Sequence, residues 1–429
     1  MGRNVSEVAA NELCTGCGTC VAFCPQDAIR MVETRAGLLV PQVERERCNS
    51  CGVCLRVCPG VRLESGLLMS CGDAFKGEVA AAFVGKATDK QLLAGAQSGG
   101  IVTSLLKYLL HSGQIDKALV TTMPDNQALR PVPMATDDLE QVMRARGSKY
   151  CPTGLNAVLK DVPKGSRLAM VSLACHTHGV CNARRLGLKM PAESVFIIGL
   201  VCDRMMTFHA IDHLVESSGV NAADVSGFEY RSKVWRGWPG DVCIRTRSGA
   251  NHFVPKETRM LIKDAFTPVR CRLCFDKLNV LADVVVGDAY GFCADKEGAS
   301  VVLARTPKAM EVLSAAQAAR FIDLRAIEPR DVFERQRIDR RRLDWTCYMA
   351  AWEKMGRPAP DFGMDRKWLA DRSRASIRPY LRRLKWASRL AALKDKRRQK
   401  RAVKRHLFLL GISRLPVVKS LVKRLVRRV

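Results

Sequence analysis

Eight cysteines near the start of the chain fall into two copies of one spacing, and this repeat constrains the fold of that region more than any other feature. The copies read Cys14-x-x-Cys17-x-x-Cys20-x-x-x-Cys24-Pro25 and Cys48-x-x-Cys51-x-x-Cys54-x-x-x-Cys58-Pro59. Zinc sites usually use two cysteine pairs separated by a long insert, without a third cysteine two residues on. Soft thiolates at two-residue gaps suit the corners of an iron–sulfur cubane. The repeat therefore predicts two iron–sulfur clusters rather than zinc.

The fourth cysteine of each copy, placed before proline, is typical of bacterial ferredoxins, where it binds the cluster of the other copy. By that pattern the ligands divide crosswise into Cys14, Cys17, Cys20 and Cys58 for one [4Fe–4S] cluster and Cys48, Cys51, Cys54 and Cys24 for the other. We expect residues 1–72 to form an α+β ferredoxin domain of the bacterial type. Such a domain passes single electrons, so the substrate chemistry has to come from elsewhere in the chain or from a partner.

The length and composition predict a globular protein of two or three domains. The chain has 429 residues, 47% of them hydrophobic, and single cores stop growing at roughly 250–300 residues. Its 18 cysteines follow no apolar N-terminal signal region, so we expect most to be reduced ligands or buried thiols in the cytoplasm. No stretch reaches the roughly 18 uninterrupted apolar residues that a membrane-spanning helix needs.

Positive charge is concentrated at the C-terminal end. The formal net charge is +28, and residues 365–429 contain 23 Lys and Arg against 3 Asp and Glu. We expect residues 336–429 to form a basic, amphipathic helical tail; its last segment places Val418, Leu421, Val422, Leu425, Val426 and Val429 on one face. Such a helix is typical of attachment to an anionic membrane surface. Docking to a partner protein is the alternative, and nucleic acid is disfavoured because no recognised nucleic-acid fold accompanies the charge.

The segment Gly95–Gly113 has the periodicity of an amphipathic helix. Ser98 is the predicted N-cap and Gly113 the predicted stop. Gly99 and Gly100 at its start leave backbone N–H groups open to an anion such as the pyrophosphate of a flavin or nucleotide. An ordinary capped helix with a tight backbone approach explains the same glycines equally well.

Three apolar runs end in residues that can bind a ligand. They end at Cys175, Cys202 and Asp288, and helical stretches separate them. This arrangement predicts a buried, largely parallel sheet whose ligands bind beyond the carboxyl ends of the strands. Cys271 and Cys274 directly precede the third run. The four cysteines can therefore form a third four-thiolate site; buried free cysteines are the alternative.

Four segments together resemble the β subunit of coenzyme F-420 hydrogenases and dehydrogenases, a family of flavin-containing iron–sulfur oxidoreductases. They are "VGKATDKQLLAGAQSGGIVTSLLKYLLHSGQIDKALV", "RARGSKY", the strand ends "VSLACHTHGV" and "IGLVCD", and "CRLCFDKLNVLADVVVGDAYG" with the following "GASVVLART". The resemblance implies a central α/β domain over residues 73–335 that binds FAD beside a [4Fe–4S] cluster, with a fused or partner ferredoxin.

The resemblance also implies which residues form the site. The flavin contacts carried over are Gln97, Ser98, Gly99, Gly100, Thr103, Ser148, Lys149, Tyr150 and Asp288, and the third cluster takes Cys175, Cys202, Cys271 and Cys274. Lys149, Tyr150 and His176 are the candidate general acids. The chain departs from the family at His176-Thr177-His178, where members commonly have glutamine after the cysteine, so the substrate does not follow from the resemblance.

The expected function is transfer of electrons between the ferredoxin clusters and FAD, with reduction or oxidation of an organic substrate or a deazaflavin-type coenzyme. A redox partner protein or reduced ferredoxin is expected to exchange electrons with the chain. Two alternatives remain: an electron-transfer subunit whose chemistry lies in a partner, and a membrane-associated scaffold with structural clusters. Where the tail binds a membrane, the protein lies peripherally on the inner face of the cell membrane.

Overall fold

The computed structural model describes residues 4–64, 66–68, 72–364, 374–393, 401–403 and 405. The N-terminal part consists of α1 (Ser6–Ala10), α2 (Thr19–Ala22), α3 (Val53–Arg56) and the antiparallel hairpin of β1 (Ile29–Glu33) and β2 (Leu39–Val43). Gly18 and Gly52 cap α2 and α3 with positive φ angles of 83° and 72°. The two copies of the cysteine repeat therefore use the same left-handed glycine before a short helix, which only glycine adopts without strain.

An eight-stranded sheet forms the centre of the molecule, in the order β13-β3-β12-β11-β7-β6-β4-β5. Its strands are β3 (Ala81–Ala87), β4 (Lys117–Thr122), β5 (Val132–Thr136), β6 (Arg167–Ser172), β7 (Ser194–Leu200), β11 (Val284–Asp288), β12 (Ser300–Ala304) and β13 (Ile322–Ile327). Only β4, β6, β7 and β11 pair in parallel, and the four remaining pairings are antiparallel. The prediction of a largely parallel sheet is therefore wrong at both edges and right at the centre.

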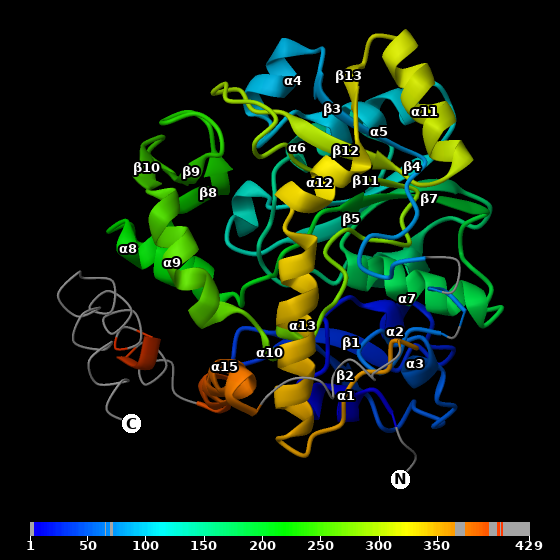
Figure 1. The fold of residues 1–429 in the computed structure, drawn as a ribbon, viewed down its shortest axis with the longest axis vertical. Coiled ribbons are helices and arrows are strands. Elements are labelled where there is room, and N and C mark those ends of the chain that lie inside the picture. The colour runs from blue at the N-terminus through cyan, green and yellow to red at the C-terminus, as the bar shows by residue number, and fades with distance from the viewer. Residues whose placement is uncertain are drawn as a thin grey trace.

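Alternate residues of the central strands face two separate cores. Ala169 of β6 and Ile198 of β7 pack with α5 (Ile101–His111) and α11 (Pro307–Ala318). Met170 and Ile197 face the other way, into a core shared with the N-terminal part. Because side chains alternate across a strand, one sheet holds the helices on one face and the ferredoxin domain on the other (Figure 1).

A smaller three-stranded sheet lies to one side of the large one (Figure 1). It contains β8 (Val225–Ser232), β9 (Asp241–Thr246) and β10 (Asn251–Val254), and it shares a third core with α8 (His209–Ser217) and α9 (Lys256–Phe266). Further helices before the C-terminal part are α4 (Lys90–Gly95), α6 (Leu139–Arg144), α7 (Ala174–Arg185), α10 (Val269–Arg272), α12 (Pro329–Arg335), and the 3-10 turns Asp125–Gln127, Leu155–Asp161 and Ala222–Asp224.

Two C-terminal helices belong to the globular body. In α13 (Ile338–Glu353) the side chains of Trp345 and Trp352 are buried in the core that the ferredoxin domain shares. The next described helix, α15 (Arg374–Ala392), places Tyr380 against Tyr348 of α13, with ring centroids 4.8 Å apart. The tail predicted over 336–429 therefore begins with packed helices; the domain boundary itself stays a prediction.

The apolar face predicted from Val418 to Val429 lies outside the described residues. In the ranges that the structure describes, no helix combines the length and the hydropathy needed to cross a bilayer.

Candidate functional site

The thiols of the two cysteine copies lie close to one another in the ferredoxin domain, and their division into crosswise ligand sets stays a prediction. Burial raises the pKa of Cys20 well above its usual value, and the neighbouring thiols of Cys17, Cys58 and Cys14 raise it further. Burial also raises the pKa of Cys58, with Cys17 and Cys14 beside it. These raised values show that thiols of both copies lie together in a poorly solvated site. Binding of a cluster is expected to relieve the electrostatic repulsion between these sulfur atoms, because a bond to iron replaces the proton of each thiol.

The second set of the ferredoxin domain is less enclosed. Burial raises the pKa of Cys54, and the thiols of Cys51 and Cys24 lie among its electrostatic neighbours. Cys48 is half-buried and Cys51 is exposed. A cluster held here would lie nearer to solvent than one held by Cys14, Cys17, Cys20 and Cys58.

A third group of thiols lies where the central strands end. Cys175 is the second residue of α7, directly beyond β6, and Cys202 lies two residues beyond β7. Burial raises the pKa of Cys175, and the thiols that raise it further are Cys17, Cys202, Cys274 and Cys271, in that order. Burial also raises the pKa of Cys202 to about 12, with Cys271 and Cys274 next in effect. The four strand-end and loop cysteines therefore meet at one edge of the sheet.

This group does not have the geometry of a single-ion site. Among the described residues, no three His, Cys, Asp or Glu side chains stand close enough to hold one metal ion. In a cubane each thiolate binds a different iron, so the four sulfur atoms stand further apart than around zinc. Four converging thiols offer the kind of ligands that an iron–sulfur cluster takes.

Thr19 and Asn156 join the ferredoxin domain to this edge of the sheet. The Thr19 Oγ1 atom lies 3.1 Å from Cys17 Sγ and accepts a hydrogen bond from Asn156 Nδ2 at 2.8 Å. Asn156 Nδ2 also donates to the carbonyl oxygen of His176 at 2.9 Å. A buried hydrogen-bonded chain thus connects Cys17 to the residue beside Cys175. Thr19 and Asn156 are wholly buried, which makes this contact a fixed part of the fold.

The resemblance did not identify Arg231, which organises the predicted flavin site. This buried residue at the end of β8 donates to both carboxylate oxygens of Asp288, at 2.7 and 2.8 Å. It also donates to Tyr150 Oη at 3.2 Å and to the Gln97 carbonyl oxygen at 3.3 Å. Trp238 Nε1 donates to Asp288 at 3.3 Å. One guanidinium therefore gathers three of the predicted flavin residues.

The loop before α5 is closely packed. Gln97 Oε1 accepts a hydrogen bond from the Ser148 backbone N–H at 2.8 Å, which joins two predicted flavin segments. A Cβ added at Gly99 would lie 2.4 Å from the Gly85 carbonyl oxygen. Gly99 is therefore required for a tight backbone approach, as the alternative explanation of these glycines predicts.

The start of α5 differs from the prediction. Ser98 is not the N-cap: its hydroxyl lies 3.0 Å from Ser300 Oγ, and Gly100 caps the helix with φ 75°. The predicted N-cap is wrong because a left-handed residue is needed where the chain turns into the helix. No side chain caps the first turn of α5, so its N–H groups keep the anion-binding character expected of a helix N-terminus. Thr103, also predicted, is buried in that turn.

The three candidate general acids have different surroundings. His176 is buried: its Nδ1 accepts from the Leu173 backbone N–H at 3.2 Å and its Nε2 lies 2.9 Å from the Thr153 carbonyl oxygen. Burial lowers its pKa to about 4. Both ring nitrogens are thus bonded to the backbone, and proton transfer by His176 would require breaking one of these bonds.

Lys149 and Tyr150 differ from His176. Lys149 Nζ donates to the carbonyl oxygens of Ala145 and Arg146, at 2.5 and 3.1 Å, beyond the end of α6. Desolvation lowers the pKa of Lys149 to about 7. The Tyr150 hydroxyl accepts a hydrogen bond from Arg231 Nη1, and the same nitrogen donates to Asp288. Arg231 thus connects the Tyr150 hydroxyl to the Asp288 carboxylate.

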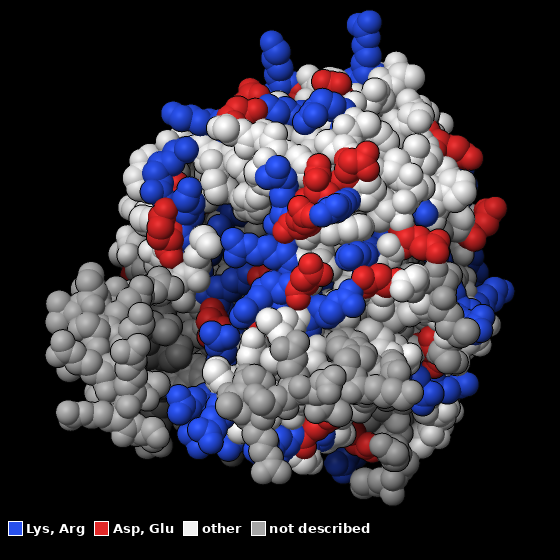
Figure 2. All heavy atoms as spheres, in the orientation of Figure 1, with Lys and Arg blue, Asp and Glu red and all other residues white. Residues whose placement is uncertain are grey.

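Lys and Arg side chains gather over α12 and the start of α13, as Figure 2 shows. The arginines of this segment are Arg330, Arg335, Arg337, Arg340, Arg341 and Arg342. Arg341 is buried and donates to the Cys202 carbonyl oxygen at 3.1 Å. Others are paired, as Arg340 is with Asp344 at 3.1 Å. Arg341 therefore connects this basic surface to the third thiol group, through its hydrogen bond to Cys202.

Comparison with known families divides the chain into three matched parts. Residues 13–60 match the 4Fe-4S dicluster domain. Residues 82–160 match the N-terminal part, and residues 165–330 the C-terminal part, of the coenzyme F420 hydrogenase/dehydrogenase beta subunit. The proposed boundaries at residues 72 and 335 stay predictions.

Several proteins of known name are similar to this chain. A subunit of the F(420)H(2) dehydrogenase of Methanosarcina mazei is 31% identical over 303 residues, which cover 67% of this chain and 78% of that protein. The coenzyme F420 hydrogenase beta subunit of Methanosarcina barkeri is 25% identical over 264 residues, covering 60% of this chain and 85% of that protein. The chloroplastic 7-hydroxymethyl chlorophyll a reductase of Oryza sativa subsp. japonica is 25% identical over 199 residues, covering 45% and 40%.

One solved structure is also similar. It is the F420-reducing [NiFe] hydrogenase complex from Methanosarcina barkeri, with a TM-score of 0.48 and 24% identity over 62% of this chain and 92% of that chain. The relatives of known name are oxidoreductases or subunits of them. The matched domains confirm the resemblance stated from the sequence: this chain belongs to the coenzyme F420 hydrogenase/dehydrogenase beta subunit family and has an N-terminal 4Fe-4S dicluster domain.

Proposed function

We propose that the chain is an iron–sulfur flavoprotein that moves electrons between ferredoxin-type [4Fe–4S] clusters and FAD, and so reduces or oxidises an organic substrate or a deazaflavin-type coenzyme. The main support is the spatial order of its thiols. Cys17 of the ferredoxin domain neighbours Cys175, and Cys202 follows β7, which pairs with β11. Asp288 ends β11. Groups for one-electron transfer thus lead toward the proposed flavin residues.

The proposed flavin residues form a donor set that fits a dinucleotide. They are Gln97, Ser98, Gly99, Gly100, Thr103, Ser148, Lys149 and Asp288, with Tyr150 and Arg231 beside them. The uncapped first turn of α5 suits a pyrophosphate. The rings of Trp238 and Tyr290, 4.9 Å apart, offer an aromatic surface at the same place. Bound FAD would supply the exchange between hydride equivalents and single electrons.

We assign Cys175, Cys202, Cys271 and Cys274 to a third [4Fe–4S] cluster beside the FAD. The buried cations next to these thiols support this assignment, because a cluster held by four thiolates is anionic. Arg270 and Arg341 both lower the pKa of Cys274 against the effect of burial, which is the largest and raises it. For proton transfer to a substrate we propose Lys149, since its pKa of about 7 matches the working pH of a general acid. Tyr150, the next residue in the chain, is the second candidate.

A second candidate is an electron-transfer subunit whose substrate chemistry lies in a partner protein. It is favoured because two of the relatives are named as subunits. The arginine-rich surface over α12 and α13 suits an acidic partner or an anionic substrate equally. We further propose that the basic C-terminal tail brings the protein to an anionic membrane surface in the cytoplasm.

The decisive experiment is anaerobic purification with iron, sulfide and flavin measured together. Three clusters predict about 12 iron atoms per chain and two predict about 8, from four per cubane. Changing Cys271 and Cys274 to Ser is expected to remove about 4 iron atoms, with Cys243→Ser, outside all three groups, as the matched control. A chain purified without stoichiometric flavin contradicts the proposal, and iron unchanged at about 8 contradicts the third cluster.

A second measurement separates the two candidates. The protein is reduced with dithionite, freed of excess reductant and mixed with small-molecule acceptors in the absence of any partner. Reoxidation of flavin and clusters under these conditions supports an enzyme that is complete by itself. A protein that is reoxidised only after a partner protein is added is the electron-transfer subunit.

A further inference from the structure

The two copies of the cysteine repeat differ in the residue before their third cysteine. Thr19 precedes Cys20 in the first copy, and Val53 precedes Cys54 in the second. Both residues begin a short helix after a left-handed glycine, so their backbones are alike. Threonine and valine side chains have nearly the same shape, but only threonine has a hydroxyl. From this position the first copy can therefore make a hydrogen bond that the second cannot.

The hydroxyl of Thr19 donates its proton to sulfur. Asn156 Nδ2 donates to Thr19 Oγ1 at 2.8 Å and to the His176 carbonyl oxygen at 2.9 Å. A carbonyl oxygen can only accept, so the amide of Asn156 has to present its NH₂ group here. Thr19 Oγ1 is therefore the acceptor in its bond with Asn156. Among the described residues, its own proton can reach Cys17 Sγ, 3.1 Å away. A Cys17 thiolate has no proton to give, which fixes this direction.

Asn156 holds this hydrogen bond in place. Its backbone N–H donates to the Cys17 carbonyl oxygen at 2.9 Å, so the same residue positions both the cysteine and the hydroxyl beside it. The side chains of Thr19 and Asn156 are fully buried. Water therefore does not compete for the hydroxyl, and consecutive hydrogen bonds in such a chain strengthen one another.

A hydrogen bond to a ligand sulfur favours the reduced form of a cluster. Reduction adds one negative charge, part of it on the sulfur atoms, and a donor stabilises that charge. Burial has the opposite effect, because poorly solvated surroundings penalise the added charge. The first set is the more enclosed: Cys20 and Cys58 are buried, whereas Cys51 of the second set is exposed. The hydroxyl of Thr19 thus offsets a cost that burial imposes on the enclosed set.

We propose that Thr19 raises the reduction potential of the enclosed ferredoxin cluster, so that this cluster accepts an electron from the one nearer to solvent. The proposal rests on the proposed function, because it takes both cysteine sets as [4Fe–4S] sites. In this step one electron leaves the reduced outer cluster and enters the oxidised inner one, while no bond changes and no proton moves. The inner set adjoins the third thiol group, since Cys17 is an electrostatic neighbour of Cys175. Thr19 is a positioning residue that acts through Cys17.

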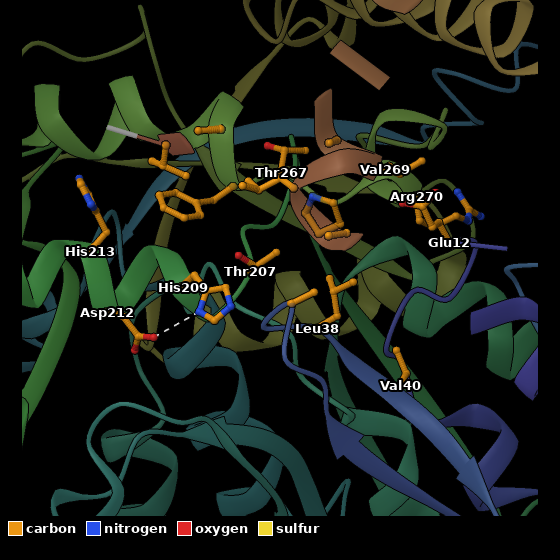
Figure 3. Close-up of a pocket in the computed structure, with 18 of the residues that line it drawn as sticks. Glu12, Leu38, Val40, Thr207, His209, Asp212, His213, Thr267, Val269 and Arg270 are labelled. Atoms are coloured by element: carbon orange, nitrogen blue, oxygen red, sulfur yellow. Dashed lines mark hydrogen bonds and ion pairs between the residues drawn. The ribbon is translucent and has the colours of Figure 1, made fainter. Parts of the chain in front are cut away.

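Other contacts of the enclosed set stay the same when Thr19 is changed. Cys14 lines a cavity of about 490 Å³, and Figure 3 shows Leu38 and Arg270 in the same wall. Burial raises the pKa of Cys14 to about 12, against the effects of the Gly16 backbone N–H and the charge of Arg270. Gly16 and Arg270 act on Cys14 and make no contact with the Thr19 hydroxyl. A change of potential in Thr19 variants can therefore be assigned to the hydroxyl.

The test is potentiometric reduction of the anaerobically purified full-length protein, followed by EPR spectroscopy of the reduced clusters. Thr19→Val removes the hydroxyl and keeps the shape of the side chain. We expect one potential to fall by about 59 mV, which corresponds to a tenfold lower affinity for one electron, and the other potentials to stay unchanged. Thr19→Ser keeps the hydroxyl and should preserve the original potential. Thr19→Ala differs from Thr19→Ser only by the hydroxyl and should show the fall.

Three results overturn the proposal: equal potentials with threonine and valine, a fall in the Thr19→Ser variant as large as in Thr19→Ala, or an equal fall in every potential. The last result identifies a general change of the fold. Iron and sulfide are measured in the same preparations. Fewer than about 8 iron atoms per chain would contradict the ferredoxin clusters and with them the proposed function. A fully loaded protein whose potentials do not move contradicts only the role of Thr19. If Thr19→Val does not load iron, the Ser and Ala variants carry the test.

Discussion

At the scale of single residues, Arg231 is the clearest addition to the site. Its partners Gln97, Tyr150 and Asp288 were all predicted, but Arg231 itself lies near the end of β8 and belongs to no motif. Arg231 and Asp288 are 57 residues apart in the chain. No local spacing links two residues so far apart, so only the folded structure identifies the pair.

Removing the Arg231 guanidinium tests this pair. Breaking a buried ion pair from one side costs about 3–5 kcal/mol, because the remaining charge is left without a partner. Asp288 keeps 18% of its side chain exposed, so we expect Arg231→Met to lower the free energy of unfolding by about 3 kcal/mol, at the low end of that range. Urea denaturation measures it. The double variant Arg231→Met with Asp288→Asn should recover most of the loss; a loss as large as in the single variant would show that the pair does not matter.

The lowered pKa of Lys149 predicts that the stability of the protein changes with pH. Its pKa is lowered to about 7 by desolvation, so between pH 7 and its ordinary range the unfolded chain binds a proton that the folded chain does not. Stability linked to Lys149 therefore rises with pH across this window. Relative to Lys149→Met, we expect a gain of about 2 kcal/mol from pH 7 to 10, reduced by solvent screening at a half-buried amine. Parallel stability curves for the two proteins would contradict the lowered pKa.

At the scale of elements, the contact of α2 with α7 holds the ferredoxin domain to the sheet. A Cβ at Gly179 of α7 would lie 2.0 Å from Thr19 Oγ1, so the two helices touch only because residue 179 has no side chain. This close approach brings Cys17 and Cys175 together. The backbone distance between two helices thus sets the distance between two proposed clusters.

Gly179→Ala is expected to push these helices apart. Overpacking of this kind costs about 1–3 kcal/mol, and electron transfer between the clusters should slow, as observed by rapid-mixing spectroscopy of cluster reduction. Gly72→Ala is the control, because a Cβ there meets no atom within 4 Å. Equal stability and equal reduction rates in both variants would refute the role assigned to Gly179.

The helix α15 changes how the basic tail should be tested. Tyr380 donates a hydrogen bond to Asp344 at 2.8 Å, and Leu384 of the same helix is completely buried. A chain that ends at residue 364 loses these contacts, and we expect its melting temperature to fall by several degrees, as for a loss of about 2 kcal/mol or more. A chain that ends at residue 393 keeps α15 and loses Val403 of the third core, so its melting temperature should fall less than that of the chain ending at residue 364.

Flotation with anionic liposomes then tests the tail with the fold intact. The full chain is expected to float with the vesicles and the chain ending at residue 393 to remain behind, because all Lys and Arg residues after α15 have been removed. If both chains float equally, membrane attachment lies elsewhere.

At the scale of the whole molecule, the two faces of the large sheet pack against different parts of the chain. One face holds α5 and α11 in an ordinary apolar core, and the other shares its core with Cys20, Cys54 and Cys58 of the ferredoxin domain. The redox groups are therefore placed against the sheet face opposite to α5. The strands β6, β7 and β11 are neighbours and end at the same edge of the sheet. The third thiol group and Asp288 therefore lie next to each other along this edge.

The sequence by itself determined what depends on near neighbours in the chain. Cysteine spacing and the apolar runs that end at Cys175, Cys202 and Asp288 are local patterns, and the fold keeps the strands that these runs predict. The antiparallel edges of the sheet were missed, because an apolar run has the same pattern in either direction. Only tertiary structure decided which distant groups meet: Arg231 with Asp288, Thr19 with Asn156, and Arg270 with the cavity beside Cys14. The physical reason is that such contacts depend on how whole elements pack, and packing leaves no periodic signal in the chain.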